Sequence, residues 1–179
     1  MIKKILKITR NLTILVIGIT SLYLINLFYM KPFSIDHFLG KELAMELVDS
    51  PEALTYIGIF DRFNWITKHN SKLSIPEDGD LENEINKTKG IIRNLYKYED
   101  VNLSDTQKST KKIAIFDYEN NLKELQDFPF HDYPLNQIGG IHLNTIEFMS
   151  DMHPVRNKNE ANDFIKRVNL IKEVYEGIA

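Results

Sequence analysis

Residues 11–30 read NLTILVIGITSLYLINLFYM and contain no charged side chain. A helix rises about 1.5 Å per residue, so a stretch of this length spans roughly 30 Å, the thickness of a bilayer's hydrocarbon core. Asn26 is the most costly residue in such a helix, but it lies about one turn from the outer end, where water or headgroups can reach it. The stretch therefore predicts a transmembrane helix around which the rest of the chain is organised.

The charges beside this stretch predict its orientation. Four basic residues and no acidic ones precede it, and they are Lys3, Lys4, Lys7 and Arg10. Positive charges near a membrane span favour the cytoplasmic side, and the single Lys31 at the other end does not outweigh them. We expect a single-pass membrane protein whose N-terminus is cytoplasmic and whose residues 31–179 are extracytoplasmic.

A cleaved signal peptide is the main alternative for the same stretch. The basic start and the apolar run fit a signal peptide, but residues 27–31, LFYMK, offer no small-residue cleavage site. The chain has no cysteine, which excludes a lipoprotein signal. We favour an uncleaved signal anchor over a cleaved signal, and both over a buried core helix, which is seldom apolar on all faces.

The composition limits what residues 31–179 do. They contain 18 basic and 25 acidic residues, a net charge of −7, and they show no basic patch interleaved with aromatic residues. Such a domain is not expected to bind nucleic acid. The absence of cysteine excludes disulfides, thiol nucleophiles and thiolate metal sites.

Apolar residues recur at three- and four-residue spacing after Met30, which predicts an all-α domain of about five to six helices. Expected helices follow Ser34 and then cover residues 50–59, 80–98, 104–126, 137–152 and 157–177, with connections at 60–79 and 127–136. Helix-capping patterns begin at Ser34, Ser50, Asp80, Ser104 and Asn157.

The apolar rows of these helices predict the core. Its expected members are Phe38, Leu39, Leu43, Leu47, Val48, Leu81, Ile85, Ile91, Ile92, Leu95, Ile113, Ile115, Phe116, Leu122, Leu125, Ile141, Ile146, Phe148, Met149, Phe164, Ile165, Val168, Ile171 and Val174. The aromatic residues Phe60, Phe63 and Trp65 of the long connection are expected to fold back onto this core.

The sequence offers little catalytic chemistry. The five histidines form no H-E-x-x-H motif, and no nucleophile motif of the G-x-S-x-G or S-x-x-K type is present. The pair His131-Asp132 can act as a base with its orienting partner, but adjacent loop residues more often serve turn formation. We therefore assign no catalytic, metal-binding or cofactor-binding residue.

Three segments together resemble the bacterial family called domain of unknown function 885. Residues 50–58, SPEALTYIG, resemble its S-P-x-x-x-T-x-x-G opening, and residues 133–140, YPLNQIGG, resemble a later segment that precedes a helix. His153-Pro followed by residues 160–168, EANDFIKRV, resembles its H-P and D/E-A-x-x-Y/F-x-x-R-L elements. The order and spacing of the three segments match those of the family, and together the segments cover about residues 40–176.

The resemblance implies a large, mostly helical fold similar to zinc metallopeptidases of the gluzincin and carboxypeptidase type. Such proteins carry an H-E-x-x-H helix farther along the chain, with a further glutamate ligand downstream, and none of these residues has a counterpart here. We expect a truncated gene product, or one half of a split gene, that is inert alone. Its expected partners are the membrane and either a separately encoded C-terminal half or another protein. Such a fragment should expose apolar surface on its last helix, at Ile171, Val174, Tyr175 and Ile178.

Two other functions stay open at this point. One is a self-sufficient, membrane-anchored helical module that binds a protein or peptide. The other is an enzyme of unrecognised type that uses His131, Asp132 and His142.

Overall fold

The computed structural model describes residues 2–129 and 135–178. These residues form eight α-helices joined by loops and contain no strand, which confirms the predicted all-α class. The α-helices are α1 (Ile2–Tyr29), α2 (Ile35–Asp49), α3 (Pro51–Ile57), α4 (Asn64–Thr67), α5 (Asp80–Tyr96), α6 (Asp105–Asp127), α7 (Ile141–Glu147) and α8 (Lys158–Gly177). Short turns complete the fold: the 3-10 helices η1 (Asp61–Phe63), η2 (His69–Ser71) and η3 (Asp100–Asn102), and the π-helical η4 (Phe148–Met152).

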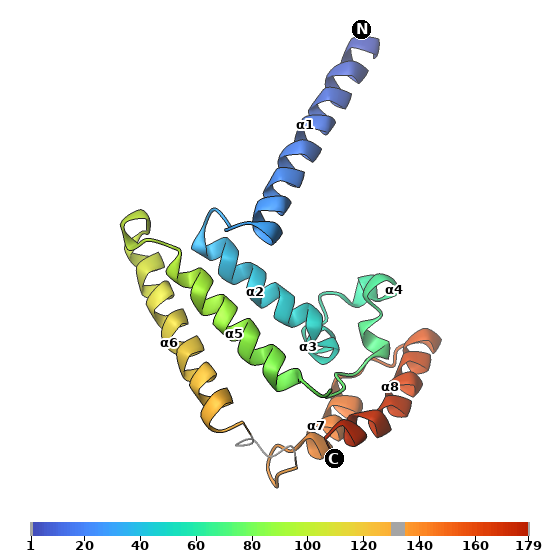
Figure 1. Ribbon diagram of the computed structural model, residues 1–179. Helices are drawn as coiled ribbons and strands as arrows, with labels where there is room; N and C mark the ends of the chain where they lie inside the picture. Colours follow the sequence, from blue (N-terminus) through green and yellow to red (C-terminus); the bar gives the residue numbers. More distant parts are fainter. Residues whose placement is uncertain (1, 130–134, 179) are drawn as a thin grey trace.

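Helix α1 projects from the other helices as a single rod (Figure 1). It begins at Ile2, well before the uncharged stretch, and its segment from Leu6 to Tyr29 is long and apolar enough to cross a membrane. Its apolar side chains, such as Leu15 and Ile19, are exposed and are not covered by the other helices. Length and composition thus fit a membrane-spanning helix.

Asn26 joins α1 to the rest of the protein. Its Nδ2 atom donates to the backbone oxygen of Lys31 at 2.9 Å, and its Oδ1 atom accepts from the backbone N–H of Phe33 at 3.0 Å. The side chain is only 7% exposed. The amide therefore satisfies the backbone where the chain turns between α1 and α2, which explains a polar residue at this end of an apolar helix.

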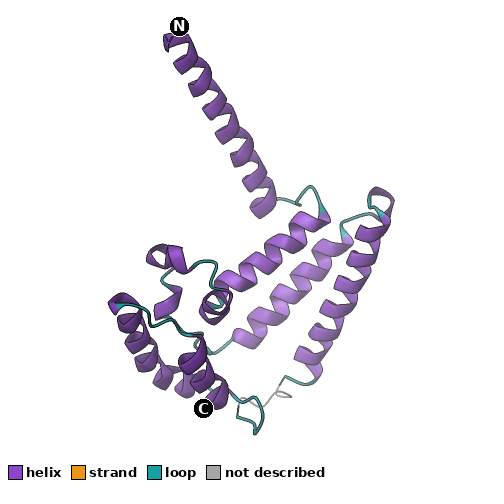
Figure 2. Cartoon of the chain, turned by 180° about the vertical axis from the view of Figure 1, so that it is seen from behind, coloured by secondary structure: helices purple, strands orange, loops and turns teal. Residues whose placement is uncertain are grey.

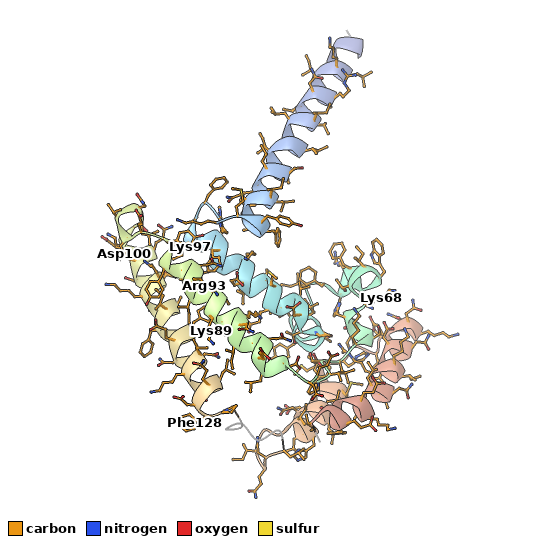
Figure 3. The ribbon with its side chains drawn as sticks, viewed as in Figure 1. Lys68, Lys89, Arg93, Lys97, Asp100 and Phe128 are labelled. Carbon is orange, nitrogen blue, oxygen red and sulfur yellow. The ribbon has the colours of Figure 1, made fainter. Side chains whose placement is uncertain are left out.

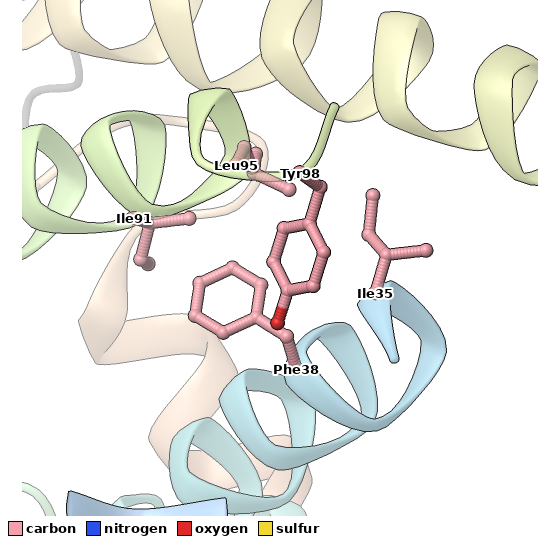
Figure 4. Close-up of a cluster of buried hydrophobic side chains, with 5 residues drawn as sticks. All are labelled: Ile35, Phe38, Ile91, Leu95 and Tyr98. Atoms are coloured by element: carbon pink, nitrogen blue, oxygen red, sulfur yellow. The ribbon is translucent and has the colours of Figure 1, made fainter. Parts of the chain in front are cut away.

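Helices α2, α5 and α6 lie side by side (Figures 1 and 2). The buried cluster between them consists of Ile35, Phe38, Ile91, Leu95 and Tyr98 (Figure 4). The hydroxyl of Tyr98 donates to the backbone oxygen of Pro32 at 2.9 Å, and burial raises the pKa of this tyrosine to about 12. This cluster is the apolar core beneath α1.

The predicted caps mostly form. The side chains of Ser34, Ser50 and Asn157 accept backbone N–H bonds at the starts of α2, α3 and α8, and Ser104 forms a full capping box with Gln107. The cap predicted at Asp80 is wrong, because Gly79 is the capping residue and Asp80 instead accepts from the backbone N–H of Glu77. The first and last turns of most helices are thus fixed locally.

Several predicted core residues are exposed. These are Leu43 and Val48 on α2, Ile113 and Phe116 on α6, Ile146 on α7, and Ile165 and Val168 on α8. The described helices form an open arrangement in which α6 packs chiefly against α5, so no residue of α6 is fully buried. A periodic apolar row predicts which side chains share a face but not whether another helix covers that face.

The connection at residues 60–79 differs from its prediction in two ways. It contains η1, α4 and η2, and its aromatic side chains point outward, with Trp65 75% exposed. The prediction that Phe60, Phe63 and Trp65 fold back onto the core is wrong. Polar side chains of the same segment occupy the inner side instead.

The end of α8 is covered rather than open. Val174 is buried, whereas Ile171, Tyr175 and Ile178 are half-buried, so the predicted exposed apolar surface at this place is wrong. A Cβ atom on Gly177 would collide with the backbone oxygen of Pro76. The extended segment before α5 therefore passes directly over the end of α8, and glycine permits this close approach.

Candidate functional site

Arg167 on α8 is the largest completely buried side chain, with 0% exposure. It lies in the inward row of α8, three residues after Phe164, four before Ile171 and seven before Val174. In an amphipathic helix these positions face the interior. The sequence thus places an arginine where an apolar residue is expected, and the structure must supply polar partners for it.

The oxygen atoms that accept hydrogen bonds from Arg167 come from two separate segments, α3 and the end of η2. The Nε atom donates to the backbone oxygen of Lys72 at 2.8 Å, and Nη2 donates to the backbone oxygen of His69 at 2.8 Å and to Oγ1 of Thr55 at 2.7 Å. A longer contact of 3.4 Å joins Nη2 to the backbone oxygen of Pro51. Arg167 thereby ties α8 to α3 and to η2, which are far from it in the sequence.

The third segment is the π-helical turn η4. It brings two rings onto the guanidinium group: Phe148 stacks at 4.8 Å from its carbon atom, and Nδ1 of His153 lies 2.8 Å from Nη1. Arginine only donates, so Nδ1 of His153 carries no proton and accepts this bond. The other ring nitrogen, Nε2, then carries the proton and donates to the backbone oxygen of Glu160 at 3.2 Å.

None of the atoms that accept a hydrogen bond from Arg167 belongs to a carboxylate. Burial lowers the pKa of Arg167 to about 10, although attraction from Glu52, Asp163 and Asp61 opposes this effect. The guanidinium is still charged at neutral pH, and backbone and neutral side-chain dipoles replace its water. Burial also lowers the pKa of His153, and the positive charge of Arg167 adds to that effect.

A layer of polar side chains holds these partners in place. Oγ1 of Thr55 lies 2.8 Å from Oδ1 of Asn70, to which it can donate while it accepts from Arg167. The backbone N–H of Asn70 donates to Oδ1 of Asn64 at 3.0 Å, and Nδ2 of Asn64 donates to Asp163 at 3.0 Å. The geometry around Arg167 is therefore fixed from both α3 and α8.

His69 lies beside this cluster, and one of its ring nitrogens makes no hydrogen bond to the described residues. Its Nε2 atom is 3.6 Å from Oδ1 of Asp61, and both atoms are buried without a hydrogen bond. Its Nδ1 atom lies 2.6 Å from Oγ1 of Thr67, and burial lowers the pKa of the ring. The other carboxylate oxygen of Asp61 accepts from Arg156 at 2.7 Å.

The arrangement favours a structural role over catalysis. The guanidinium is sealed, and its surrounding donors and acceptors bond to one another rather than to an open cavity. Within residues 2–129 and 135–178, no group of three histidine or carboxylate side chains is placed to hold a metal ion. Phe148 also lines a cleft of about 410 Å³ between α3, α7 and α8, together with Glu52, Leu73 and Val174 among others.

The three residues that the sequence suggested for catalysis are His131, Asp132 and His142. His131 and Asp132 lie outside the described residues. His142 is half-buried at the start of α7, and its Nδ1 atom is buried without a hydrogen-bond partner. Neither observation places a base beside a nucleophile.

Two of the three segments that carry the family resemblance meet at Arg167. Pro51 and Thr55 come from residues 50–58, while His153 and Arg167 belong to the later H-P and helical elements. The third segment is described only from residue 135 onward, where Gly140 precedes α7. His69 and Asn70 were missed because no local pattern distinguishes them from surface loop residues.

Comparisons with family models, with curated proteins and with solved structures find no match for this chain.

Proposed function

We propose that residues 31–179 form the non-catalytic, N-terminal part of a metallopeptidase-like protein of the domain of unknown function 885 family, held at a membrane by α1. The observation that carries this proposal is the meeting of resembling segments at one buried cluster. Thr55 lies 112 residues before Arg167 and His153 lies 14 residues before it, and both side chains bond to the guanidinium of Arg167. A family is expected to retain the residues that together form one buried cluster, because each of them depends on the others for its hydrogen bonds.

The proposed task of the cluster is to fix the wall of a substrate cleft. Arg167 connects α8 to α3 and η2, and Phe148 and His153 add η4 to the same centre. Those elements surround the cleft beside Glu52 and Phe148. A rigid wall of this kind holds substrate in position but performs no bond cleavage by itself.

The proposal assigns zinc chemistry to another part of the protein. A two-histidine zinc site needs both ligands on one helix face and a glutamate directed at the bound water. The 179 residues contain no H-E-x-x-H motif. We place that helix in further sequence of the same polypeptide or in a separately encoded partner, and we place the N-terminus of α1 in the cytoplasm.

Purification from native membranes tests this function. The chain carries a tag after Met1, and the isolated material is crosslinked and analysed by mass spectrometry, with an unrelated tagged single-pass protein as control. We expect peptides that contain H-E-x-x-H, from the same polypeptide or from a specific partner. A 20.9-kDa protein recovered without any such peptide contradicts the proposal, as does zinc-dependent peptide hydrolysis by the purified 179 residues alone.

The cleft beside Glu52 favours a second candidate, a membrane-anchored module that binds a protein or peptide. Its lining combines apolar side chains with one carboxylate, and the two oxygens of Glu52 accept from the backbone N–H and the hydroxyl of Ser74 at 2.7 Å each. Recovery of a specific partner without an H-E-x-x-H sequence favours this candidate over the first.

A further inference from the structure

The segment at residues 59–66 exposes its apolar side chains and directs its polar side chains inward, which is the opposite of an ordinary surface segment. Ile59 is 69% exposed, Trp65 75% and Ile66 59%, and Phe63 is exposed as well. Tyr56, at the end of α3, is also 69% exposed. Large apolar side chains exposed together in one short segment indicate a contact with another phase or another molecule.

The polar side chains of the same segment point inward and hold it in place. Asp61 binds Arg156 at 2.7 Å, and Asn64 donates to Asp163 on α8 at 3.0 Å. The αL conformations of Gly58 and Lys68 reverse the chain at either end. The outward position of the apolar side chains is therefore built into the fold and is not the result of a loose loop.

The position of the segment relative to α1 indicates what covers it. η1 and α4 lie on the side of the outer helices toward which α1 projects, whereas α7 and the C-terminus lie on the opposite side (Figures 1 and 2). Lys68 marks the end of α4 on that side (Figure 3). Asn26 bonds to the loop between α1 and α2, and the ring of Tyr23 packs on His37 of α2, so α1 contacts the outer helices at this end.

We propose that residues 59–66 insert into the interfacial region of the same bilayer that α1 spans. This inference rests on the proposed location of α1 in a membrane. Tryptophan and tyrosine favour the level of the lipid headgroups, where one end of the ring is apolar and the other is wet. A segment tethered by α1 meets the bilayer at high effective concentration, so a modest apolar area is enough for lasting contact.

The charges of the segment agree with a lipid surface. Its exposed ion is the cation Arg62, the exposed cation Lys68 follows two residues after its end, and its single acidic residue, Asp61, is paired with Arg156. Cations beside an apolar surface attract anionic headgroups. The rest of the outer domain is acidic overall, so this local charge sets the segment apart.

Trp65 is the only tryptophan in the chain, so its fluorescence reports on this segment directly. The full chain is reconstituted in vesicles of phosphatidylcholine, with and without phosphatidylglycerol, that contain lipids brominated near the headgroup. We expect Trp65 emission to shift to shorter wavelength and to be quenched by these lipids. We also expect Arg62→Glu to weaken the quenching more in vesicles that contain phosphatidylglycerol.

Two control variants separate the possible failures, both in a Trp65→Phe background. Leu15→Trp reports on α1 in parallel vesicles whose lipids are brominated deep in the acyl chains, because Leu15 lies near the middle of the apolar segment Leu6–Tyr29. Phe116→Trp reports on a similarly exposed aromatic position of α6 that should stay unquenched. Quenching of Leu15→Trp without quenching of Trp65 overturns the inference while α1 remains in the membrane. Quenching of neither overturns the membrane location as well, and a shifted but unquenched Trp65 shows that protein, not lipid, covers the segment.

Discussion

Nη1 of Arg167 lies 2.8 Å from Nδ1 of His153, and both side chains are buried. The contact fixes His153 as a neutral ring with its proton on Nε2, because a charged ring would direct a second donor at the guanidinium. The same guanidinium bonds to Thr55 and to the backbone of His69 and Lys72. One side chain thus joins elements from both halves of the outer domain.

Replacing Arg167 should destabilise the protein strongly. Arg167→Met leaves several buried acceptors without a donor, and we expect a loss of about 3 kcal/mol in the free energy of unfolding. Arg167→Lys should restore little of it, because an ammonium group cannot reproduce the planar set of donors. Denaturant unfolding of the full chain in detergent, followed by circular dichroism, measures both changes.

Lys172→Met is the matched control for Arg167. Lys172 lies on the exposed side of α8 and pairs only with Glu176, at 3.4 Å. Its replacement should change the unfolding free energy by less than about 0.5 kcal/mol. Wild-type stability in Arg167→Lys would show that the hydrogen-bond set around Arg167 does not hold the fold together.

Stability should fall as the pH falls through the ordinary range of histidine. His69 and His153 have pKa values lowered from 6.5 in the folded protein, mainly by burial. The unfolded chain therefore binds protons more readily, and stability is full above the unfolded pKa and decreases below it, until the lowered folded pKa is reached. Each group contributes a slope of up to about 1.4 kcal/mol per pH unit.

Thermal unfolding of the full chain between about pH 7.5 and 5 measures this dependence, since the unfolded pKa of histidine is about 6.5. His153→Asn keeps an acceptor for Arg167 but does not titrate, so the slope of this variant should be smaller. An unchanged slope would mean that the contact between His153 and Arg167 does not set the charge state of this histidine.

Asn26→Leu should loosen the joint between α1 and the outer helices. It removes the partners of the Lys31 oxygen and the Phe33 N–H, at a cost of about 1–2 kcal/mol. The chain has no cysteine, so spin labels placed at Ile17→Cys and Ser109→Cys report the distance between α1 and α6. We expect a broader distance distribution in Asn26→Leu and an unchanged one in the control Ser21→Leu.

Single cysteines also measure the predicted orientation of α1. A membrane-impermeant thiol reagent should label Ser109→Cys in intact cells, because Ser109 is exposed on α6. It should label Ile2→Cys only after lysis, because the four basic residues near it favour the cytoplasm. The reverse pattern would show that the charges flanking α1 do not decide its orientation.

Much of the helical structure is predictable because its signals are local. A cap such as Ser104 bonds to the backbone three residues later, so its pattern survives in any surroundings that allow a helix. The apolar stretch of α1 needs no partner within the protein, because each backbone group bonds within the helix. The all-α class and the N-terminal apolar helix follow from such signals.

The burial of particular residues is not predictable in the same way. Phe116 and Trp65 resemble core residues by type and spacing, yet no described helix covers them. Arg167 resembles a surface residue by type, yet it is sealed among acceptors from segments about 100 residues away. The type of a residue sets the free energy that its burial would cost or gain. The packing of distant segments decides whether the residue is buried.

The sequence by itself therefore determined the long helices, most of their N-caps and the apolar character of α1, since these depend on contacts within one or two turns. It missed α4 and the division of the predicted helix 137–152 into α7 and the π-helical η4. Only the tertiary structure decided the cluster around Arg167 and the outward position of residues 59–66. Each of these depends on hydrogen bonds between segments that are separate in the sequence. Such bonds form only after the chain has brought the segments together.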